Sequence, residues 1–394
     1  MHDFYFHLRT EIHHGAGVLE GLPQTLARYG TRVLFMYDEI PAQVTGAYRL
    51  VHDLCEQAGI TVTDFTGIEP NPRHTTVDRA VEAARAADVQ AIVALGGGST
   101  IDSAKTVSFA VFHEGTCWDF YEKRATADRC LPLITVPTIA ASGSEVSNVA
   151  VMANYELGVK RDYRTDLMRP VAVFADPTYT YSVPAFQTAC GIVDIMCHSY
   201  EGYFSTSAGS IQDGFSETIQ RTCIEHGRKV MQSPRDYASR SQLLWAAELA
   251  ISHLADQGRA FVGNIHSTEG VLSSYFHLPH GAGIAITSLA WFKYSLSDAT
   301  APRYARWGRQ VWGISGDDDW TVARAAIERY ERFMEELGLP TRFSQARDQP
   351  EGDVLGEVLP VAAKRLFTEV DTTKWFVPMR SEQEVLDFMT LAYR

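Results

Sequence analysis

Four residues in the second half of the chain have the types and spacing of a metal site. Asp194 and His198 are four residues apart, so a helix would place their side chains on one face. Two further imidazoles follow at His266 and His280. One carboxylate and three imidazoles suit a divalent transition metal such as Fe2+ or Zn2+. For Asp194 and His198 alone, a hydrogen bond on a helix surface is the simpler interpretation.

A glycine-rich turn in the first half of the chain predicts an anion site. The apolar run 91–95 leads directly into residues 96–105, Gly-Gly-Gly-Ser-Thr-Ile-Asp-Ser-Ala-Lys. Glycines allow the backbone to approach a ligand closely, and a helix that follows them directs its first N–H groups and its positive dipole end toward that ligand. The turn has neither the dinucleotide fingerprint nor the Walker spacing. A plain glycine turn between a strand and a helix is therefore the alternative.

Two other positions directly after apolar runs could contact a nucleotide. The segment 137–145 carries hydroxyl groups at Thr138, Ser142 and Ser144, which could bond a phosphate, a ribose or a nicotinamide amide, although turn-forming residues also suit an ordinary surface loop. Asp38 follows the apolar run 32–37. An acidic side chain there can accept a hydrogen bond from the adenosine ribose and would repel a 2'-phosphate. An ordinary turn aspartate fits that position equally well.

The elements that must position these residues change type near the middle of the chain. Apolar runs of strand length at 32–37, 91–95, 133–136 and 171–175 alternate with helical stretches at 46–58 and 76–87. This rhythm predicts an α/β domain with a mostly parallel sheet. Later come long amphipathic stretches at 211–231, 239–254 and 320–337, which predict helices. Two prolines bracket a polar connection at 177–184, so we place a domain boundary there, between an α/β domain at 1–184 and an all-helical domain at 185–394.

Length and composition limit the classes of partner. The chain has 394 residues, 45% of them hydrophobic and 21% charged, which is globular composition with enough length for two domains. A formal net charge of -13 argues against a nucleic-acid partner or an anionic membrane surface. No apolar run is long enough to span a membrane, and the amino terminus lacks the pattern of a signal peptide. We therefore expect a cytoplasmic protein whose six cysteines are free thiols.

Together these segments resemble the iron-containing (group III) alcohol dehydrogenases, and within that family the butanol dehydrogenase and broad aldehyde reductase branch. The motifs that carry the resemblance are residues 96–105, Pro137–Glu145, Asp176-Pro177, Gly191–His198 and His266-x13-His280-Gly281. They occur in the family's order from the amino-terminal strand to about residue 315. The resemblance implies a two-domain fold like that of dehydroquinate synthase, with an α/β dinucleotide-binding domain and an all-α metal-binding domain.

The resemblance also implies roles for individual residues. The ligands of one divalent metal would be Asp194, His198, His266 and His280. The cofactor contacts would be Gly97, Gly98 and Ser99 at the pyrophosphate, Thr138 and Ser142 at the nicotinamide end, and Lys160 and Tyr179. Ser142 stands where the family usually has threonine, which keeps a hydroxyl group. Asp38 stands where NADPH-using members have glycine, so NAD(H) is favoured over NADP(H).

The implied activity is a metal-dependent alcohol dehydrogenase or aldehyde reductase that uses NAD(P)(H) and a small aldehyde or alcohol, in a homodimer or larger homo-oligomer. One departure concerns proton transfer, because many relatives have a histidine where this chain has Gly270. Two alternatives stay open: other metal and NAD chemistry on a phosphorylated or acidic polyol, and a non-catalytic cofactor-binding protein. The first would need phosphate-binding cations near the metal histidines, and the segment 260–285 has only Arg259 at its edge.

Overall fold

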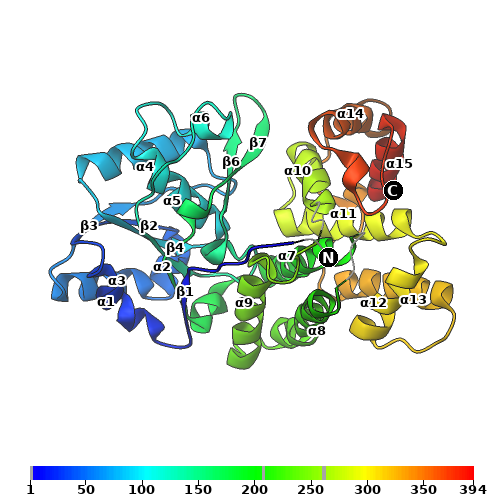
Figure 1. The fold of residues 1–394 in the computed structure, drawn as a ribbon, viewed down its shortest axis with the longest axis horizontal. Helices are drawn as coiled ribbons and strands as arrows, with labels where there is room; N and C mark the ends of the chain where they lie inside the picture. The colour runs from blue at the N-terminus through cyan, green and yellow to red at the C-terminus, as the bar shows by residue number, and fades with distance from the viewer. Residues whose placement is uncertain (1–2, 206–208, 260–262) are drawn as a thin grey trace. The chain divides into compact units, whose positions relative to one another are not determined.

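The computed structural model describes residues 3–205, 209–259 and 263–394, and its contacts divide the chain into two compact units (Figure 1). One unit comprises His7–Val183 with Arg235–Ser252. The other comprises Pro184–Pro234 and His253–Arg394 with the short amino-terminal segment. The predicted boundary, with all residues after 184 in the second domain, does not account for Arg235–Ser252. That segment packs with the first unit because Leu244 shares an apolar cluster with Val146 and Val173.

The first unit is built on a parallel sheet. In the described residues this sheet has six strands in the order β1-β8-β5-β4-β2-β3. They are β1 (Glu11–His14), β2 (Arg32–Tyr37), β3 (Thr61–Phe65), β4 (Ala91–Gly96), β5 (Leu133–Pro137) and β8 (Ala172–Ala175). The chain passes from β2 to β3 on one side and then returns to place β4 on the other side of β2. Ligands of open α/β sheets bind where the strand order reverses in this way, at the carboxyl ends of the strands.

Helices cover both faces of this sheet. On β2, Leu34 and Met36 join the core beneath α4 (His74–Ala86) and α5 (Gly98–Ala110). The alternating residues Val33 and Phe35 join the core beneath α1 (Leu22–Leu26) and α3 (Ala47–Gln57). Because both faces are buried, the central strands are mainly apolar instead of alternating. The remaining elements are α2 (Glu39–Val44), α6 (Trp118–Tyr121), α9 (Tyr237–Ile251), the antiparallel hairpin β6 (Val149–Asn154) and β7 (Val159–Arg164), and the 3-10 turns η1 (Val18–Gly21), η2 (Ser144–Val146), η3 (Asp166–Met168) and η4 (Pro177–Ser182).

The second unit is helical. Its helices are α7 (Ala185–Tyr203), α8 (Ser210–Gln232), α10 (Asn264–Phe276), α11 (His280–Ser295), α12 (Ala301–Trp312), α13 (Asp319–Glu336), α14 (Leu359–Glu369) and α15 (Glu382–Tyr393). Large side chains fill its core, among them the fully buried Trp291, Trp307 and Tyr330. The predicted architecture, an α/β part followed by a helical part, is confirmed. Among the described residues, no helix is both long and apolar enough to cross a membrane.

Candidate functional site

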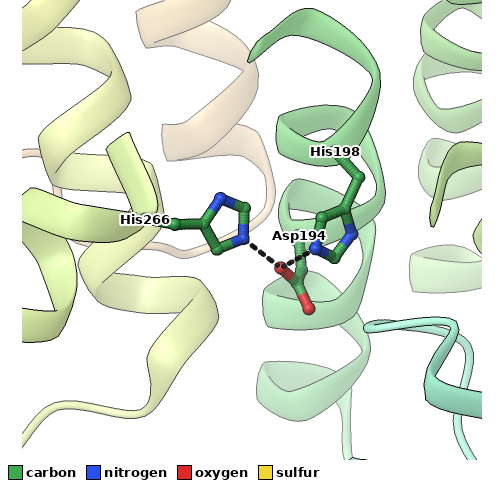
Figure 2. A group of neighbouring side chains, drawn as sticks. All are labelled: Asp194, His198 and His266. Carbon is green, nitrogen blue, oxygen red and sulfur yellow. Dashed lines mark ion pairs between the residues drawn. The ribbon is translucent and has the colours of Figure 1, made fainter. Parts of the chain in front are cut away.

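Three histidines of the helical unit converge on one carboxylate oxygen of Asp194, and Figure 2 shows two of them, His198 and His266. The Asp194 Oδ1 lies 3.8 Å from the Nε2 of His198, 3.5 Å from that of His266 and 3.7 Å from that of His280. The rings of His198 and His266 are stacked with their centroids 4.7 Å apart. Asp194 and His198 lie one turn apart on α7, while His266 lies on α10 and His280 begins α11. The structure thus brings together all four predicted ligands.

These atoms face one another at distances too long for hydrogen bonds. Asp194 Oδ1 and His266 Nε2 are buried, and neither has a hydrogen-bond partner among the described residues. A buried polar atom without a partner costs free energy. A cation bound among the ligand atoms of Asp194, His198 and His266, which all lie within 4.8 Å of one another, would remove that cost. The donor set therefore fits a divalent transition metal.

Electrostatics prepare Asp194 and His198 in the charge state that a metal needs. Burial lowers the pKa of His198 to about 4, so its ring is neutral at physiological pH. Burial alone would raise the pKa of Asp194, but the imidazoles of His198, His266 and His280 outweigh it and hold that pKa well below its usual range. Neutral imidazoles and an ionised carboxylate are the coordinating forms of these side chains. For His266, Cys197, Glu201 and Asp194 outweigh burial and raise the pKa well above its usual range, so a metal would displace a proton from that ring.

A close approach of two helices accounts for the His280-Gly281 pair. A Cβ atom on Gly281 would collide with the backbone of Cys190 on α7. Only glycine lets the first turn of α11 lie this close to α7. As a result His280, one residue earlier, reaches Asp194 one turn further along α7.

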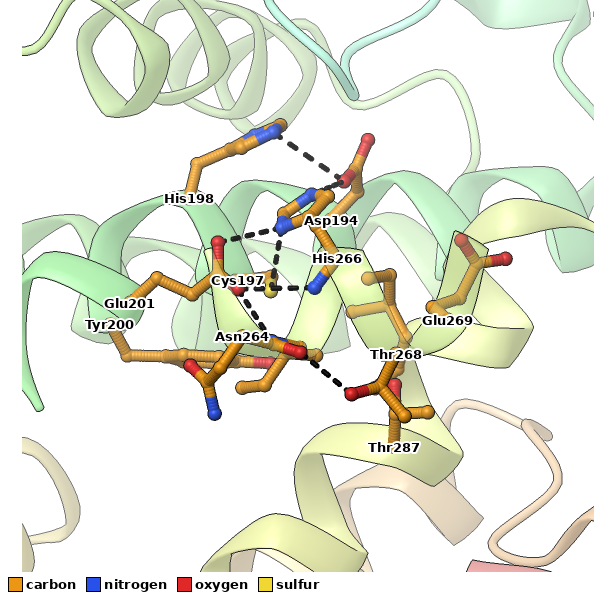
Figure 3. A network of polar contacts seen from close by, with 12 residues as sticks. Asp194, Cys197, His198, Tyr200, Glu201, Asn264, His266, Thr268, Glu269 and Thr287 are labelled. Carbon is orange, nitrogen blue, oxygen red and sulfur yellow. Dashed lines mark hydrogen bonds and ion pairs between the residues drawn. The ribbon is translucent and has the colours of Figure 1, made fainter. Parts of the chain in front are cut away.

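Two carboxylates that the sequence analysis did not assign hold two of the imidazoles, and Figure 3 shows the first of these pairs, Glu201 with His266. The Nδ1 of His266 donates to Glu201 Oε2 at 2.7 Å, and the Nδ1 of His280 donates to Glu269 Oε2 at 2.6 Å. The spacing of both glutamates from the predicted ligands could have indicated them in the sequence. Glu201 is seven residues after Asp194 and three after His198, and Glu269 is three after His266, so each shares a helix face with a ligand.

The structure leaves room at Gly270, where the family resemblance predicts a further histidine. No heavy atom outside the local backbone lies within 4 Å of a Cβ built on Gly270. The nearby His277 is exposed and ends α10 with a φ of 49°. It is thus placed as a solvated residue at a helix end.

The predicted nucleotide contacts of the α/β unit gather at the carboxyl ends of β2, β4 and β5. The backbone N–H of Asp38 donates to Leu95 O at 3.0 Å, and that of Thr138 donates to Gly96 O at 3.1 Å. Helix α5 begins at Gly98, so Gly97 precedes it and Ser99 lies in its first turn. A Cβ on Gly98 would come within 2.8 Å of the Ser142 Oγ, which places that hydroxyl group over the start of α5.

The last residues of the glycine-rich segment hold the unit together. Lys105 is fully buried, and its Nζ donates to Ser144 Oγ, Ser147 Oγ and Val149 O, each at 2.8 Å. Asp102 accepts from Ser144 Oγ at 2.5 Å and from the backbone N–H of Val151 at 2.9 Å. These bonds tie α5 to the segment that follows β5 and to the hairpin β6–β7.

Two further predicted cofactor residues lie on other elements of the unit, β7 and η4. Lys160 lies on β7, opposite Ala153 of β6. Tyr179, in η4, is only 7% exposed and belongs to the apolar cluster that includes Tyr37 and Leu95. The structure gives Tyr179 a packing role, and its contact with a cofactor stays a prediction.

Comparisons with known proteins identify the class of protein. Residues 9–177 match the family described as iron-containing alcohol dehydrogenase. Residues 188–387 match the carboxy-terminal domain of the Fe-containing alcohol dehydrogenase family. The chain therefore belongs to the iron-containing alcohol dehydrogenase family, and it is an oxidoreductase of the alcohol and aldehyde type.

Within this family, the chain is similar to butanol dehydrogenases and to an aldehyde reductase. The chain is 36% identical over 347 residues to NADH-dependent butanol dehydrogenase A of Clostridium acetobutylicum, over 88% of this chain and 89% of the relative. It is 31% identical over 348 residues to the NADPH-dependent aldehyde reductase YqhD of Escherichia coli, over 87% of this chain and 89% of the relative. The crystal structure of NADH-dependent butanol dehydrogenase A from Thermotoga maritima matches the fold with a TM-score of 0.92 at 27% identity, covering 100% of this chain and 99% of that chain.

Proposed function

We propose that this enzyme interconverts small aldehydes and alcohols with NAD(H) at a metal centre formed by Asp194, His198, His266 and His280. The observation that carries the proposal is the convergence of three Nε2 atoms on the buried Asp194 Oδ1 at 3.5–3.8 Å. The butanol and aldehyde substrates named for the similar proteins support a small substrate. A homodimer or larger homo-oligomer is part of the proposal, and light scattering of the purified protein would test it.

Bound NAD(H) would supply the hydride for the carbonyl carbon, and a proton would complete the alcohol. A divalent cation bound at this centre would act as a Lewis acid on the carbonyl oxygen. Asp194 and the three imidazoles supply its ligands, while Glu201 and Glu269 hold the Nδ1 atoms of His266 and His280. No imidazole stands at Gly270, so we assign the proton to water or to a relay through a ribose hydroxyl group.

The α/β unit would hold the cofactor. The N–H groups at Gly98 and Ser99 begin α5, where a pyrophosphate gains from unpaired donors and the helix dipole. The hydroxyl groups of Thr138 and Ser142 would orient the nicotinamide end. Lys160 and Tyr179 complete the proposed cofactor contacts, and Asp38 favours NADH over NADPH.

The alternative chemistry on a phosphorylated polyol needs a free cation near the metal histidines. Arg259, the candidate from the sequence, donates to Gly202 O at 3.0 Å and to Gly209 O at 2.8 Å and also bonds Asp213. Its side chain is 1% exposed. Arg259 is therefore committed to internal contacts. A non-catalytic role is disfavoured, because apolar residues would pack this part of the core better than one carboxylate and three imidazoles do.

A substrate panel on metal-defined protein tests the proposal. Protein stripped of metal and reloaded with Fe2+ or Zn2+ should reduce short aldehydes with NADH, and His266→Ala protein under the same loading should not. The matched control is His277→Ala, which changes an exposed histidine just past the carboxyl end of the same helix, α10. Tight metal and NADH binding without reduction of any aldehyde would reject the dehydrogenase assignment in favour of the alternatives.

A further inference from the structure

The imidazoles of the candidate metal centre are held in two different ways. His266 and His280 come from helices other than the one that carries Asp194, and each donates its Nδ1 proton to a buried glutamate. His198 shares α7 with Asp194, and its Nδ1 is buried without a hydrogen-bond partner among the described residues. The two ligand histidines with a carboxylate partner are thus those that lie on helices other than α7.

Glu201 connects α7 to the start of α10. Its Oε1 accepts the backbone N–H groups of Ile265 at 2.8 Å and His266 at 3.1 Å, while its Oε2 accepts the His266 Nδ1 at 2.7 Å (Figure 3). The first N–H groups of a helix have no partner within the helix. Glu201 supplies an acceptor for two of these N–H groups. The same carboxylate orients the His266 ring so that its Nε2 faces Asp194. The Glu201 side chain is 0% exposed.

Glu269 connects α10 to the start of α11. Its side chain is 1% exposed, and it accepts the His280 Nδ1 at 2.6 Å. Helix α11 makes room for it with Gly283, because a Cβ there would lie 2.8 Å from the Glu269 Cγ and 2.9 Å from its Oε1. A small residue on α11 is therefore part of the arrangement that holds this carboxylate.

We propose that Glu201 and Glu269 are positioning residues that link α7 to α10 and α10 to α11, and so preset the tautomer and direction of His266 and His280 for metal binding. The inference rests on the proposed metal centre. Hydrogen bonds of this kind to ligand histidines change metal affinity by about 10- to 100-fold in other proteins.

The two glutamates differ in a way that amide substitutions can separate. Glu201 accepts from three donors, so Glu201→Gln must turn its NH2 group toward either the His266 Nδ1–H or the two backbone N–H groups. Glu269 accepts from His280 through Oε2, and Glu269→Gln can still accept that bond through its amide oxygen. The loss of affinity should therefore be larger for Glu201→Gln.

The test measures metal binding apart from turnover. Full-length wild-type protein, Glu201→Gln, Glu269→Gln and Gly283→Ala are stripped of metal, checked for folding by thermal unfolding, and titrated with Zn2+ against a chromophoric chelator. Co2+ absorption spectra then report the ligand geometry. Glu217→Gln serves as the control, because Glu217 is a buried glutamate of the same unit that accepts from Tyr203 and Arg306.

We expect Glu201→Gln to weaken Zn2+ binding by at least about 10-fold, with smaller losses for Glu269→Gln and an altered Co2+ spectrum for Gly283→Ala. Glu217→Gln should bind as the wild type does. Folded Glu201→Gln and Glu269→Gln with wild-type affinity and spectra would overturn the inference while leaving the metal centre intact. If Glu201→Gln fails to fold, Glu269→Gln and Gly283→Ala decide the question. A wild-type protein that binds neither ion would overturn the proposed function and this inference with it.

Discussion

Replacing Asp38 with asparagine should weaken the preference for NADH over NADPH. Asp38 directly follows β2 at the carboxyl edge of the sheet, beside the end of β4, where an adenosine ribose is expected. The added 2'-phosphate of NADPH carries between about one and a half and two negative charges near neutral pH. Asparagine keeps the size of the side chain and an acceptor at the start of α2. The variant therefore removes mainly the charge.

The exposure of Asp38 sets the size of the effect. Its side chain is exposed, so the effective dielectric constant lies between about 20 at a protein surface and about 80 in water. At a separation of about 6 Å, two unit charges then repel by about 0.7 to 2.8 kcal/mol, and salt reduces this further. A net effect of about 1 to 2 kcal/mol corresponds to about 5- to 30-fold in the ratio of kcat/KM for the two cofactors.

The assay compares kcat/KM for NADH and NADPH in the wild type and in Asp38→Asn at low and moderate salt. The shift in the ratio should shrink as the ionic strength rises, since an exposed charge is screened. Glu39→Gln is the matched control, because Glu39 is the adjacent exposed acid on α2. A wild type that prefers NADPH would refute the reasoning, as would an unchanged ratio in Asp38→Asn at every salt concentration.

Three further predictions address the metal, the proton and the pH dependence of stability. His266→Ala and His280→Ala should each lose most of the bound metal, and full occupancy by elemental analysis would contradict the ligand assignment. Gly270→His has room for its side chain and should raise turnover, by at most about 10²- to 10⁴-fold, or shift the pH profile at matched metal content; an unchanged rate and profile would contradict it. Burial raises the pKa of Glu145, and burial together with Glu145 raises that of Glu248, so the folded protein retains protons that the unfolded chain releases. Stability from these groups is fully present below the ordinary value of 4.5 and is lost as the pH rises through the raised folded-state pKa. Glu145→Gln should flatten this loss in urea unfolding, and profiles parallel to the wild type would count against it.

The sequence predicted those strands of the sheet that are buried on both faces. The runs at β2, β4, β5 and β8 are apolar because helices cover both sides. The edge strands β1 (Glu-Ile-His-His) and β3 (Thr-Val-Thr-Asp-Phe) carry polar residues. Loops have a similar mixture of polar and apolar residues, so hydrophobic periodicity alone does not distinguish these edge strands from loops. The hairpin strand β7 is largely exposed and charged, and it was missed for the same reason.

The sequence predicted those parts of the candidate site whose residues lie one helical turn apart. Asp194 and His198 follow from one turn of α7, whereas the direction of His280 depends on Gly281 and on the close approach of two helices. Glu201 and Glu269 lie at helical spacings that were visible in the sequence. Buried glutamates at such spacings also occur in ordinary ion pairs, so only the 2.7 Å and 2.6 Å contacts reveal their partners.

The position of α9 in the chain affects how the α/β unit can be produced by itself. Leu244 of α9 shares an apolar cluster with Val173 and Ala175 of β8, yet Pro184–Pro234 of the helical unit is synthesised between them. A fragment that ends at Val183 would leave those apolar side chains in water. During translation this part of the core likewise stays open until residue 252 has left the ribosome. An independent version of the unit requires α9 to be joined to the carboxyl end of η4 by a new linker.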